Sequence, residues 1–223
     1  MSEILSSSPA PRVFAQPFPS MDDVASEGLN FTIALLAIIF LAPLMLAVAV
    51  AILACDRGPI VFAHRRVGRG GKSFACLKFR SMAVDAEARL ADLLACDPEA
   101  RVEWSKDHKL RSDPRVTKLG AFLRRTSLDE LPQLFNVLIG DMSLVGPRPI
   151  VEAEIKKYGR RFGHYCSVKP GITGLWQVSG RNDTTYRARV AMDCIYAQRR
   201  TVGLDLAVLF NTVPAVLSRR GSY

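Results

Sequence analysis

An apolar run of 25 residues, from Phe31 to Cys55, constrains this chain more than any other feature of its sequence. Only Thr32 and Pro43 interrupt it. A straight helix of that length would reach about 37 Å, which exceeds the roughly 30 Å hydrocarbon thickness of a bilayer. A secretory signal is disfavoured, because the run begins far from Met1 and no basic n-region precedes it. We therefore predict a membrane-embedded helix over residues 29–56.

Pro43 leaves two geometries open for this segment. It lies near the middle of the run and removes the helical hydrogen bond to the carbonyl of Ile39. Each arm, 31–42 and 44–54, is only about 16 to 18 Å long and is too short to cross alone. The segment can be a kinked helix that spans the bilayer, or a re-entrant helix that enters and leaves by one face. Residue physics alone leaves both geometries open, and Pro43 is the break in either one.

Basic residues on the C-terminal side of the run predict its orientation. The run is closely followed by Arg57, Arg65, Arg66 and Arg69, and only Arg12 precedes it. Basic loops beside membrane segments stay preferentially in the cytoplasm. We therefore expect residues 57–223 to form a membrane-associated domain on the cytoplasmic face of the membrane.

The net charge is divided unevenly along the chain. It is +9 overall, yet residues 1–30 carry −3, so the remainder carries +12. Such a remainder is expected to bind anionic partners, namely lipid headgroups, nucleotide phosphates or nucleic acid. Residues 1–28 contain stretches rich in serine and proline without apolar periodicity, and we predict a disordered tail there. The five cysteines include no Cys-x-x-Cys pair that would indicate a zinc or redox site.

A basic β-hairpin is predicted immediately after the membrane segment. Residues 59–63 and 73–79 have the composition of strands and flank an Arg-Gly-Gly-Lys turn. Residues 56–80 carry a net charge of +6, and for most of these basic residues lipid contact or a topology signal is the simplest role. Lys78 and Arg80 differ, because they alternate with apolar residues and share one strand face, as phosphate ligands would.

The rest of the chain is predicted to be mainly helical, which makes the fold α+β. Residues 82–95 carry an apolar face and are predicted to pack as a helix against the core, whereas the polar residues 97–113 are predicted to form a loop. Residues 204–217 are apolar and end near two arginines, so they form either a core helix or an amphipathic helix at the membrane interface.

Two adjacent carboxylates, Asp129 and Glu130, lie between basic residues. Arg124 precedes them, and Arg148 follows within a Gly-Pro-Arg-Pro motif. Carboxylates among fixed guanidinium groups suit chemistry on a phosphate, where an oxyanion is held near a nucleophile or a metal ligand.

The same acidic pair is also compatible with an ordinary helix start. Ser127 and Glu130 have the spacing of a capping box, and acidic residues in a first turn favour the helix dipole. Pro132 favours a second register with Asp129 as the N-cap, because proline is tolerated best in the first helical turn. In that register Asp129 points out of the helix end, where backbone amides also attract anions.

An ordered series of motifs gives the chain a family resemblance. The motifs are the hydrophobic segment with its central proline, KFRSM at 78–82, DPRVT at 113–117, LRRTSLDELPQL at 123–134, GDMSLVGPRP at 140–149 and KPGITGLWQ at 169–177. Together they resemble the bacterial sugar transferase family, the monotopic phosphoglycosyl transferases, over roughly residues 29–217. Larger members carry further spanning helices and a soluble module before this core, so the chain resembles the minimal catalytic form.

The resemblance implies a reaction and a cofactor. The reaction is transfer of a sugar 1-phosphate from a UDP-sugar to undecaprenyl phosphate, with release of UMP, as the first step in making exopolysaccharide, capsule or another surface glycan. It further implies Mg²⁺ at the site. The expected fold is a monotopic membrane protein in which a re-entrant helix, a basic hairpin and interfacial amphipathic helices surround a cytoplasmic catalytic core.

The resemblance also assigns roles to individual residues. It implies that Asp129 is the nucleophile and a metal ligand, forming a covalent phosphosugar ester, and that Glu130 assists it. The positions associated with phosphate binding are matched by Lys78, Arg80, Arg124 and Arg148. Family members usually carry a polar residue, often serine, before the membrane proline, whereas this chain has Ala42. That departure removes one hydroxyl that could satisfy a freed carbonyl.

Two other classes of function explain less of the pattern. A membrane-tethered binder of nucleic acid or anionic lipid would use the net charge, but it leaves the acidic pair without a role, and the chain has no recognisable nucleic-acid-binding motif. A non-catalytic scaffold of an export complex is the other class.

We expect UDP-sugar, undecaprenyl phosphate and anionic lipids as partners, and no nucleic acid. Downstream glycosyltransferases or a second copy of the chain are further candidate partners. Residues 150–223 contain no pattern that indicates which sugar is transferred.

Overall fold

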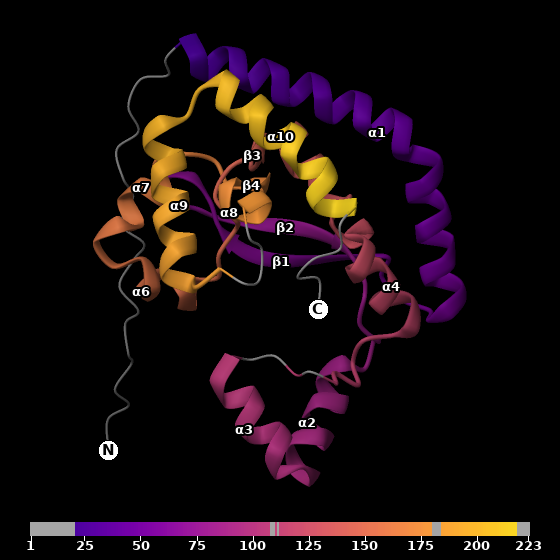
Figure 1. Ribbon diagram of the computed structural model, residues 1–223. Helices are drawn as coiled ribbons and strands as arrows, with labels where there is room; N and C mark the ends of the chain where they lie inside the picture. Colours follow the sequence, from indigo (N-terminus) through magenta and orange to yellow (C-terminus); the bar gives the residue numbers. More distant parts are fainter. Residues whose placement is uncertain (1–20, 108–109, 111, 180–183, 218–223) are drawn as a thin grey trace, which may run out of the picture.

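The computed structural model describes residues 21–107, 110, 112–179 and 184–217 (Figure 1). In chain order the elements are α1 (Met21–Cys55), β1 (Val61–Val67), η1 (Arg69–Gly71), β2 (Ser73–Phe79), α2 (Ala86–Cys96), α3 (Pro98–Asp107), α4 (Lys118–Thr126), η2 (Leu128–Glu130), α5 (Gln133–Leu138), β3 (Ser143–Val145), η3 (Glu152–Glu154), α6 (Ile155–Tyr158), η4 (Gly159–Arg161), α7 (Phe162–Ser167), β4 (Gly171–Thr173), α8 (Leu175–Ser179), α9 (Tyr186–Arg199) and α10 (Val202–Leu217). The chain is therefore α+β and mostly helical, as predicted.

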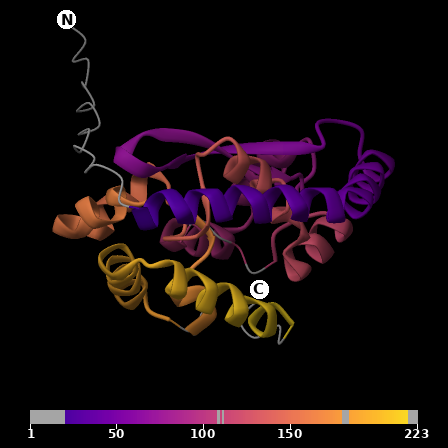
Figure 2. The ribbon, with the colours of Figure 1, turned by 90° about the horizontal axis from the view of Figure 1, so that it is seen from above.

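The apolar run forms a single long helix, α1, which contains Pro43. The helix begins at Met21, so residues 21–28, which sequence analysis assigned to the tail, are helical. Two aspartates in its first turn favour the helix dipole. The rest of the predicted tail lies outside the described residues. Figures 1 and 2 show α1 as a bent arc along one side of the body. The proline accounts for a bend, because it removes one backbone hydrogen bond inside the helix.

One face of α1 packs against the body, and the other face is apolar and exposed. The residues buried against the body include Ala34, Met45, Val48 and Ile52, and they come from both sides of Pro43. Large apolar side chains exposed on the other face include Leu36, Ile39, Phe40, Leu46 and Val50. Only 11% of the most apolar 18-residue window of α1 is buried, whereas a core helix of a soluble protein would be mostly buried. The helix is also long and apolar enough to cross a membrane.

Both ends of α1 are attached to the same body. The N-terminal contacts are Asp23 Oδ1 with Arg200 Nη1 at 2.8 Å, Ser26 Oγ with Asp205 Oδ2 at 2.8 Å, Glu27 Oε1 with Lys169 Nζ at 2.9 Å, and Asn30 Oδ1 with the Leu144 amide at 2.9 Å. At the other end, Arg80 donates a hydrogen bond to the backbone carbonyl of Asp56, just past the helix. These polar contacts attach both ends of α1 to the body.

The strands form two small sheets. β1 and β2 pair antiparallel, with Phe62 opposite Lys78 and Arg66 opposite Phe74. The first strand runs over 61–67 rather than the predicted 59–63, and the turn uses Gly70 and Gly71 at φ of 71° and 77°, a conformation that favours glycine. β3 and β4 form a short parallel pair.

Asn136 connects the hairpin to the helical core. It lies on α5, a helix that packs beneath α1, and its side chain is only 1% exposed. Its Nδ2 donates to the Ala75 carbonyl at 2.7 Å, and its Oδ1 accepts from the Leu77 amide at 2.9 Å. One amide side chain therefore satisfies two backbone groups of β2.

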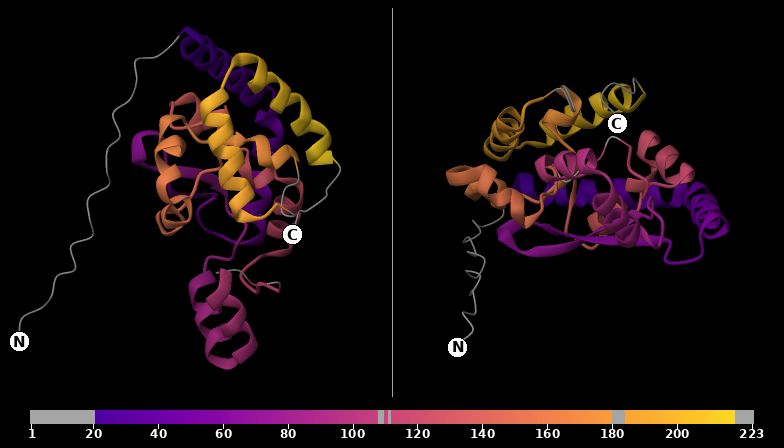
Figure 3. Two further views of the ribbon diagram at one scale, coloured as in Figure 1. Left: turned by 60° about the vertical axis from the view of Figure 1, so that its left-hand side comes forward. Right: turned by 90° about the horizontal axis from the view of Figure 1, so that it is seen from below.

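α2 and α3 differ from the sequence-based prediction. The predicted core helix is present as α2, but it contains no buried residue, and Figures 1 and 3 show it projecting from the body with α3. The predicted loop over 97–113 contains α3. Asp97 Oδ1 accepts hydrogen bonds from the Glu99 and Ala100 amides, and Pro98 opens the helix, which together form a helix-start signal. The apolar face of α2 is only half-buried because α2 contacts α3 away from the core.

α10 combines the two roles that were left open for the C-terminal helix. Val208 is buried in the core cluster that includes Ala34 of α1. Phe210 is 84% exposed and Val213 is 62% exposed on the other side of the same helix. α10 therefore packs on the core and also presents an apolar outer face.

Asn136→Ala should reduce the free energy of unfolding by about 2 kcal/mol, because it leaves the Ala75 carbonyl and the Leu77 amide without their partner. Denaturant unfolding of the detergent-solubilised protein measures the change. Asn211→Ala is the matched control, since Asn211 lies on an exposed helix face and its Nδ2 donates to the carbonyl of Ala207. The control should stay within about 0.5 kcal/mol of the wild type. Equal destabilisation by both variants would contradict the role of Asn136.

Candidate active site

Asp129 and Glu130 lie on a tight turn between α4 and α5. Ser127 adopts a left-handed conformation, with φ of 58°, and closes α4 by donating its backbone N–H to the Arg124 carbonyl. The 3₁₀ turn η2 follows, and α5 begins only at Gln133 with Pro132 as its N-cap residue. Neither predicted register describes α5, because its N-cap residue is Pro132 rather than Ser127 or Asp129. Ser127 instead ends α4 and precedes the 3₁₀ turn η2, without a side-chain cap hydrogen bond to that turn. The left-handed serine separates the acidic pair from α4, and Pro132 lies before the first residue of α5, so it interrupts no helical ladder.

Two leucines pack this turn against a hydrophobic cluster to which α1 contributes. Leu128 and Leu131 pack on the cluster of buried residues that contains Met45, Val48 and Ile52 of α1. Phe79 of β2 and Leu123 of α4 complete this cluster. The two carboxylates between the leucines contact Lys78 of β2. The acidic pair is thereby fixed between the second arm of α1 and the hairpin.

Lys78 forms ion pairs with both carboxylates. Its Nζ lies 2.6 Å from Glu130 Oε1 and 3.8 Å from Asp129 Oδ2. Burial raises the pKa of Asp129, against the opposing effect of Lys78 and Arg124. Burial would also raise the pKa of Glu130, but Lys78, Arg148 and Arg66 together lower that pKa below its ordinary value. The turn therefore carries one carboxylate with raised basicity next to one that stays ionised.

Two of the other predicted phosphate ligands lie near the acidic pair. Arg124 donates from Nε to Ser81 Oγ at 2.9 Å, and its charge acts on Asp129. Arg148 is exposed, its charge acts on Glu130, and its guanidinium lies 5.9 Å from the centre of the Trp176 ring. Among the described residues Arg148 forms no ion pair with a carboxylate.

Arg80 has a different place from Lys78, although the two were predicted to act together. Its Nη2 binds the Asp56 carbonyl and lies 3.9 Å from the Asp56 carboxylate. This contact anchors the end of α1. In the structure Arg80 thus connects the C-terminal end of α1 to the hairpin, while Lys78 contacts the carboxylates.

Arg66 is a site residue that sequence analysis missed. Its charge lowers the pKa of Glu130, and its own pKa is lowered by burial and by Arg148. Its Nη1 donates to the Pro149 carbonyl at 3.3 Å, next to Arg148. The hairpin register was the available signal, because residues of even number in β1 and β2 share one face, which puts Arg66 on the face of Lys78. Four cations then act on two carboxylates, which favours an anionic ligand.

Close backbone packing positions Arg148. The Gly146 amide donates to the Thr173 carbonyl at 2.9 Å, and the Gly171 amide donates to the Pro147 carbonyl at 2.8 Å. A Cβ atom at Gly146 would lie 2.5 Å from the Lys169 carbonyl oxygen, so a side chain cannot fit there. Two of the motifs found in the sequence therefore form one backbone unit that carries Arg148.

The donor atoms available for a divalent cation are carboxylate oxygens of Asp129 and Glu130. The described residues contain no cluster of three or more histidine, cysteine or acidic side chains suited to a metal. Mg²⁺ often takes only one or two protein carboxylates and completes its shell with substrate phosphate and water. The acidic pair fits that pattern.

Comparison with known protein families identifies the group to which the chain is related. The family described as bacterial sugar transferase matches residues 21–219. The chain belongs to the bacterial sugar transferase family. This match includes α1, the hairpin, the acidic turn and the backbone unit that carries Arg148.

Several relatives of this sugar transferase carry more specific names. The chain is 57% identical to the undecaprenyl-phosphate galactose phosphotransferase of Salmonella typhimurium, over 75% of this chain and 35% of that protein. It is 46% identical to the exopolysaccharide production protein ExoY of Sinorhizobium fredii, over 90% and 88%. It is 40% identical to the UDP-glucose:undecaprenyl-phosphate glucose-1-phosphate transferase of Xanthomonas campestris, over 86% and 38%. The chain spans about two fifths of the length of the first relatives it matches.

Lys78→Met should destabilise this sugar transferase in a pH-dependent way. Without the cation, the pKa values of both carboxyl groups should rise in the folded state, so ionising them opposes folding. We expect a loss of about 2 kcal/mol at pH 7. The loss should shrink as pH falls and the carboxyl groups become protonated.

Thermal unfolding between pH 5 and pH 8 measures this effect. Lys118→Met, on the exposed side of α4, removes the same charge and should show no such trend. A loss of stability that is equal at every pH would mean that Lys78 acts through packing alone.

Proposed function

We propose that this sugar transferase moves a sugar 1-phosphate from a UDP-sugar to undecaprenyl phosphate, releases UMP, and so initiates synthesis of exopolysaccharide, capsule or another surface glycan. The observation that carries the proposal is the buried carboxylate of Asp129, held on a turn between cations and the apolar arm of α1. A soluble donor and a lipid acceptor can meet only at the membrane surface. The names of the Salmonella and Xanthomonas relatives support the same substrates.

The first displacement uses Asp129 as the nucleophile. One of its carboxylate oxygens attacks the phosphorus that carries the sugar and forms a new O–P bond. The bond from that phosphorus to the bridging oxygen breaks, and UMP leaves with the oxygen and the electron pair. The raised pKa of Asp129 makes its ionised form a more basic nucleophile than an exposed aspartate.

The second displacement regenerates the enzyme. A phosphate oxygen of undecaprenyl phosphate attacks the same phosphorus, and the bond to Asp129 breaks. The carboxylate returns to its ionised form, and the product is a sugar linked to the lipid through a diphosphate. Splitting the exchange in this way allows the two substrates to react in turn at one phosphorus.

The surrounding cations hold the phosphates. Lys78 and Arg124 act on Asp129, whereas Arg66 and Arg148 act on Glu130, so a diphosphate would meet positive charge from two sides. Planar guanidinium groups such as that of Arg148 suit bidentate phosphate contacts. Glu130 stays ionised and orients Lys78 through their 2.6 Å contact. Arg80, which we also predicted as a phosphate ligand, sets the position of the hairpin relative to α1.

Mg²⁺ is the cofactor that suits these residues. Asp129 and Glu130 would hold it together with phosphate oxygens of the donor. When bound, it offsets phosphate charge that would otherwise repel an anionic nucleophile.

The re-entrant topology forms a second part of the proposal. Polar side chains at the N-terminal end of α1 and Asp56 beyond its C-terminal end bind one body, so a membrane crossing would pull one set of contacts apart. We infer that both ends lie on the cytoplasmic side of the inner membrane. The exposed apolar faces of α1 and α10 then contact lipid, and the basic hairpin favours anionic headgroups. Downstream glycosyltransferases or a second copy of the chain remain candidate partners.

Asp129→Asn should abolish turnover, because an amide oxygen is a poor nucleophile and its ester cannot form. Incubation with labelled UDP-sugar and Mg²⁺, without lipid acceptor, should release about one UMP per wild-type molecule. The variant should release none. Asp92→Asn, on the exposed face of α2, is the charge-matched control and should keep the full burst. Repeated turnover by Asp129→Asn would eliminate the covalent mechanism.

Pro43→Leu should convert α1 toward a spanning helix. The change removes a cost of about 3 kcal/mol against a straight helix. A tag placed before Met1 should resist external protease in wild-type cells stripped of their outer membrane, and it should become more exposed in the variant while activity falls.

Pro214→Leu is the control, since it alters a proline in the apolar helix α10 without changing α1. Its tag should remain protected. A wild-type tag that is already digested would show that α1 spans the membrane, and it would leave the proposed chemistry unaffected.

A further inference from the structure

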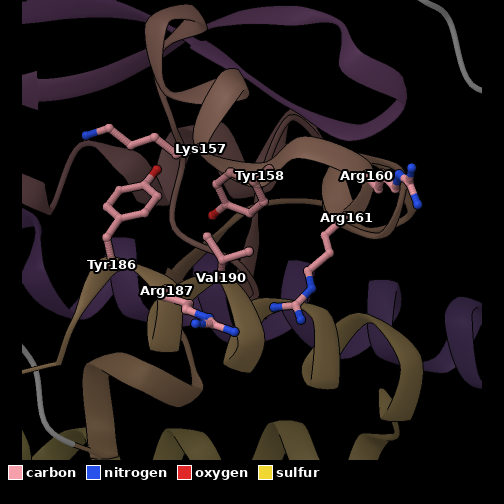
Figure 4. A pocket seen from close by; sticks show the side chains of 7 residues that line it. All are labelled: Lys157, Tyr158, Arg160, Arg161, Tyr186, Arg187 and Val190. Atoms are coloured by element: carbon pink, nitrogen blue, oxygen red, sulfur yellow. The ribbon is translucent and has the colours of Figure 1, made fainter.

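A cavity of about 510 Å³ lies between α6, η4 and the first turn of α9, and the acidic pair does not line it. Four cationic side chains contribute to its wall, namely Lys157, Arg160, Arg161 and Arg187 (Figure 4). They come from three separate elements of the chain. Cavities of this size are typical of sites for small molecules.

The positive charge of this cavity is not neutralised by its neighbours. Among the described residues, none of the four cations forms an ion pair with a carboxylate. The nearby carboxylates accept hydrogen bonds from tyrosines instead. Tyr158 donates to Asp193 at 2.7 Å, and Tyr186 donates to Glu154 at 3.4 Å. Burial also raises the pKa of Asp193 to about 7, which reduces its charge. A ligand with more than one negative charge would complement such a wall.

Aromatic rings form another part of the wall. The rings of Tyr158 and Tyr186 meet edge to face with 6.3 Å between their centres. Lys157 Nζ lies 4.6 Å from the centre of the Tyr186 ring. Figure 4 shows the two tyrosines between Lys157 on one side and the arginines on the other. The partly exposed Tyr186 ring therefore lies among cations in the cavity wall, which suits a ligand in which a ring carries phosphate.

The position of the cavity indicates a water-soluble ligand. It lies at the start of α9, whereas Arg200, just past the end of that helix, binds Asp23 of α1. The 14 residues of α9 correspond to roughly 20 Å. Figure 1 shows α6 and the start of α9 on the side of the body away from the outer face of α1. A headgroup of the lipids that contact α1 would not reach this cavity.

We propose that this cavity binds a nucleotide, with the phosphates on Arg161 and Arg187 and the nucleoside against Tyr186, at a site separate from Asp129. This goes beyond the proposed catalytic function, which requires only the acidic turn and its cations. The two arginines come from η4 and α9, so both elements take part in binding.

Equilibrium binding of labelled UMP to the detergent-solubilised full chain tests the proposal. The wild type should bind two equivalents. Arg161→Ala/Arg187→Ala should lose one of them, with at least a tenfold decrease in affinity at the cavity. Arg148→Ala should lose the other. The control Arg101→Ala/Arg199→Ala removes two exposed charges outside the cavity and should still bind two equivalents.

Further probes identify the ligand class. Inorganic pyrophosphate should bind the cavity at least tenfold more weakly than UMP, because it lacks the nucleoside. Vesicles of phosphatidylglycerol should bind the wild type and Arg161→Ala/Arg187→Ala equally. The proposal is overturned if that variant still binds two equivalents of UMP, if pyrophosphate binds as tightly as UMP, or if vesicle binding falls instead. Loss of both equivalents in Arg148→Ala would show one continuous site rather than two.

Discussion

The packing of Leu128 and Leu131 against the second arm of α1 is the contact on which the arrangement of the site depends. It holds one side of a 3₁₀ turn in apolar surroundings and leaves the carboxylates between the leucines to contact Lys78. The position of the carboxylates relative to α1 is therefore set by the same few residues that form the turn. A longer or looser connection from α4 to α5 would move the acidic pair away from α1.

An excess of cations around the acidic turn has to be held in place by the rest of the fold. Burial and the charge of Arg148 lower the pKa of Arg66, so the proximity of the two guanidinium groups is unfavourable without an anion. Backbone hydrogen bonds of Gly146 and Gly171 fix the loop that carries Arg148, and strand pairing fixes Arg66. Holding these like charges close together is unfavourable, and packing in the rest of the fold offsets that free energy. This is common at sites that bind charged ligands.

The polar contacts at the two ends of α1 explain how such a long apolar helix can belong to a compact domain. Ser26, Asp205 and Tyr196 form a buried hydrogen-bonded group at one end, and Arg80 binds Asp56 beyond the other end. Between them, the inner face of α1 contributes to the hydrophobic core while its outer face stays apolar and exposed. The helix is thus a structural part of the domain as well as the candidate anchor.

Local patterns in the sequence were sufficient to predict the apolar helix with Pro43, the basic hairpin and the acidic pair between basic residues, because each depends on composition or spacing within a short stretch. The contact of Lys78 with the acidic pair was not predicted, because it joins residues 52 positions apart. The family membership followed from the order of the motifs. Long-range packing decided the rest. The chain forms a left-handed turn at Ser127 and starts α5 later than predicted, Arg80 binds Asp56, and α2 contacts α3 away from the core, so its apolar face stays only half-buried. Arg66 joined the site only through strand register. These outcomes depend on which surfaces meet in three dimensions, and the periodicity of one segment does not contain that information.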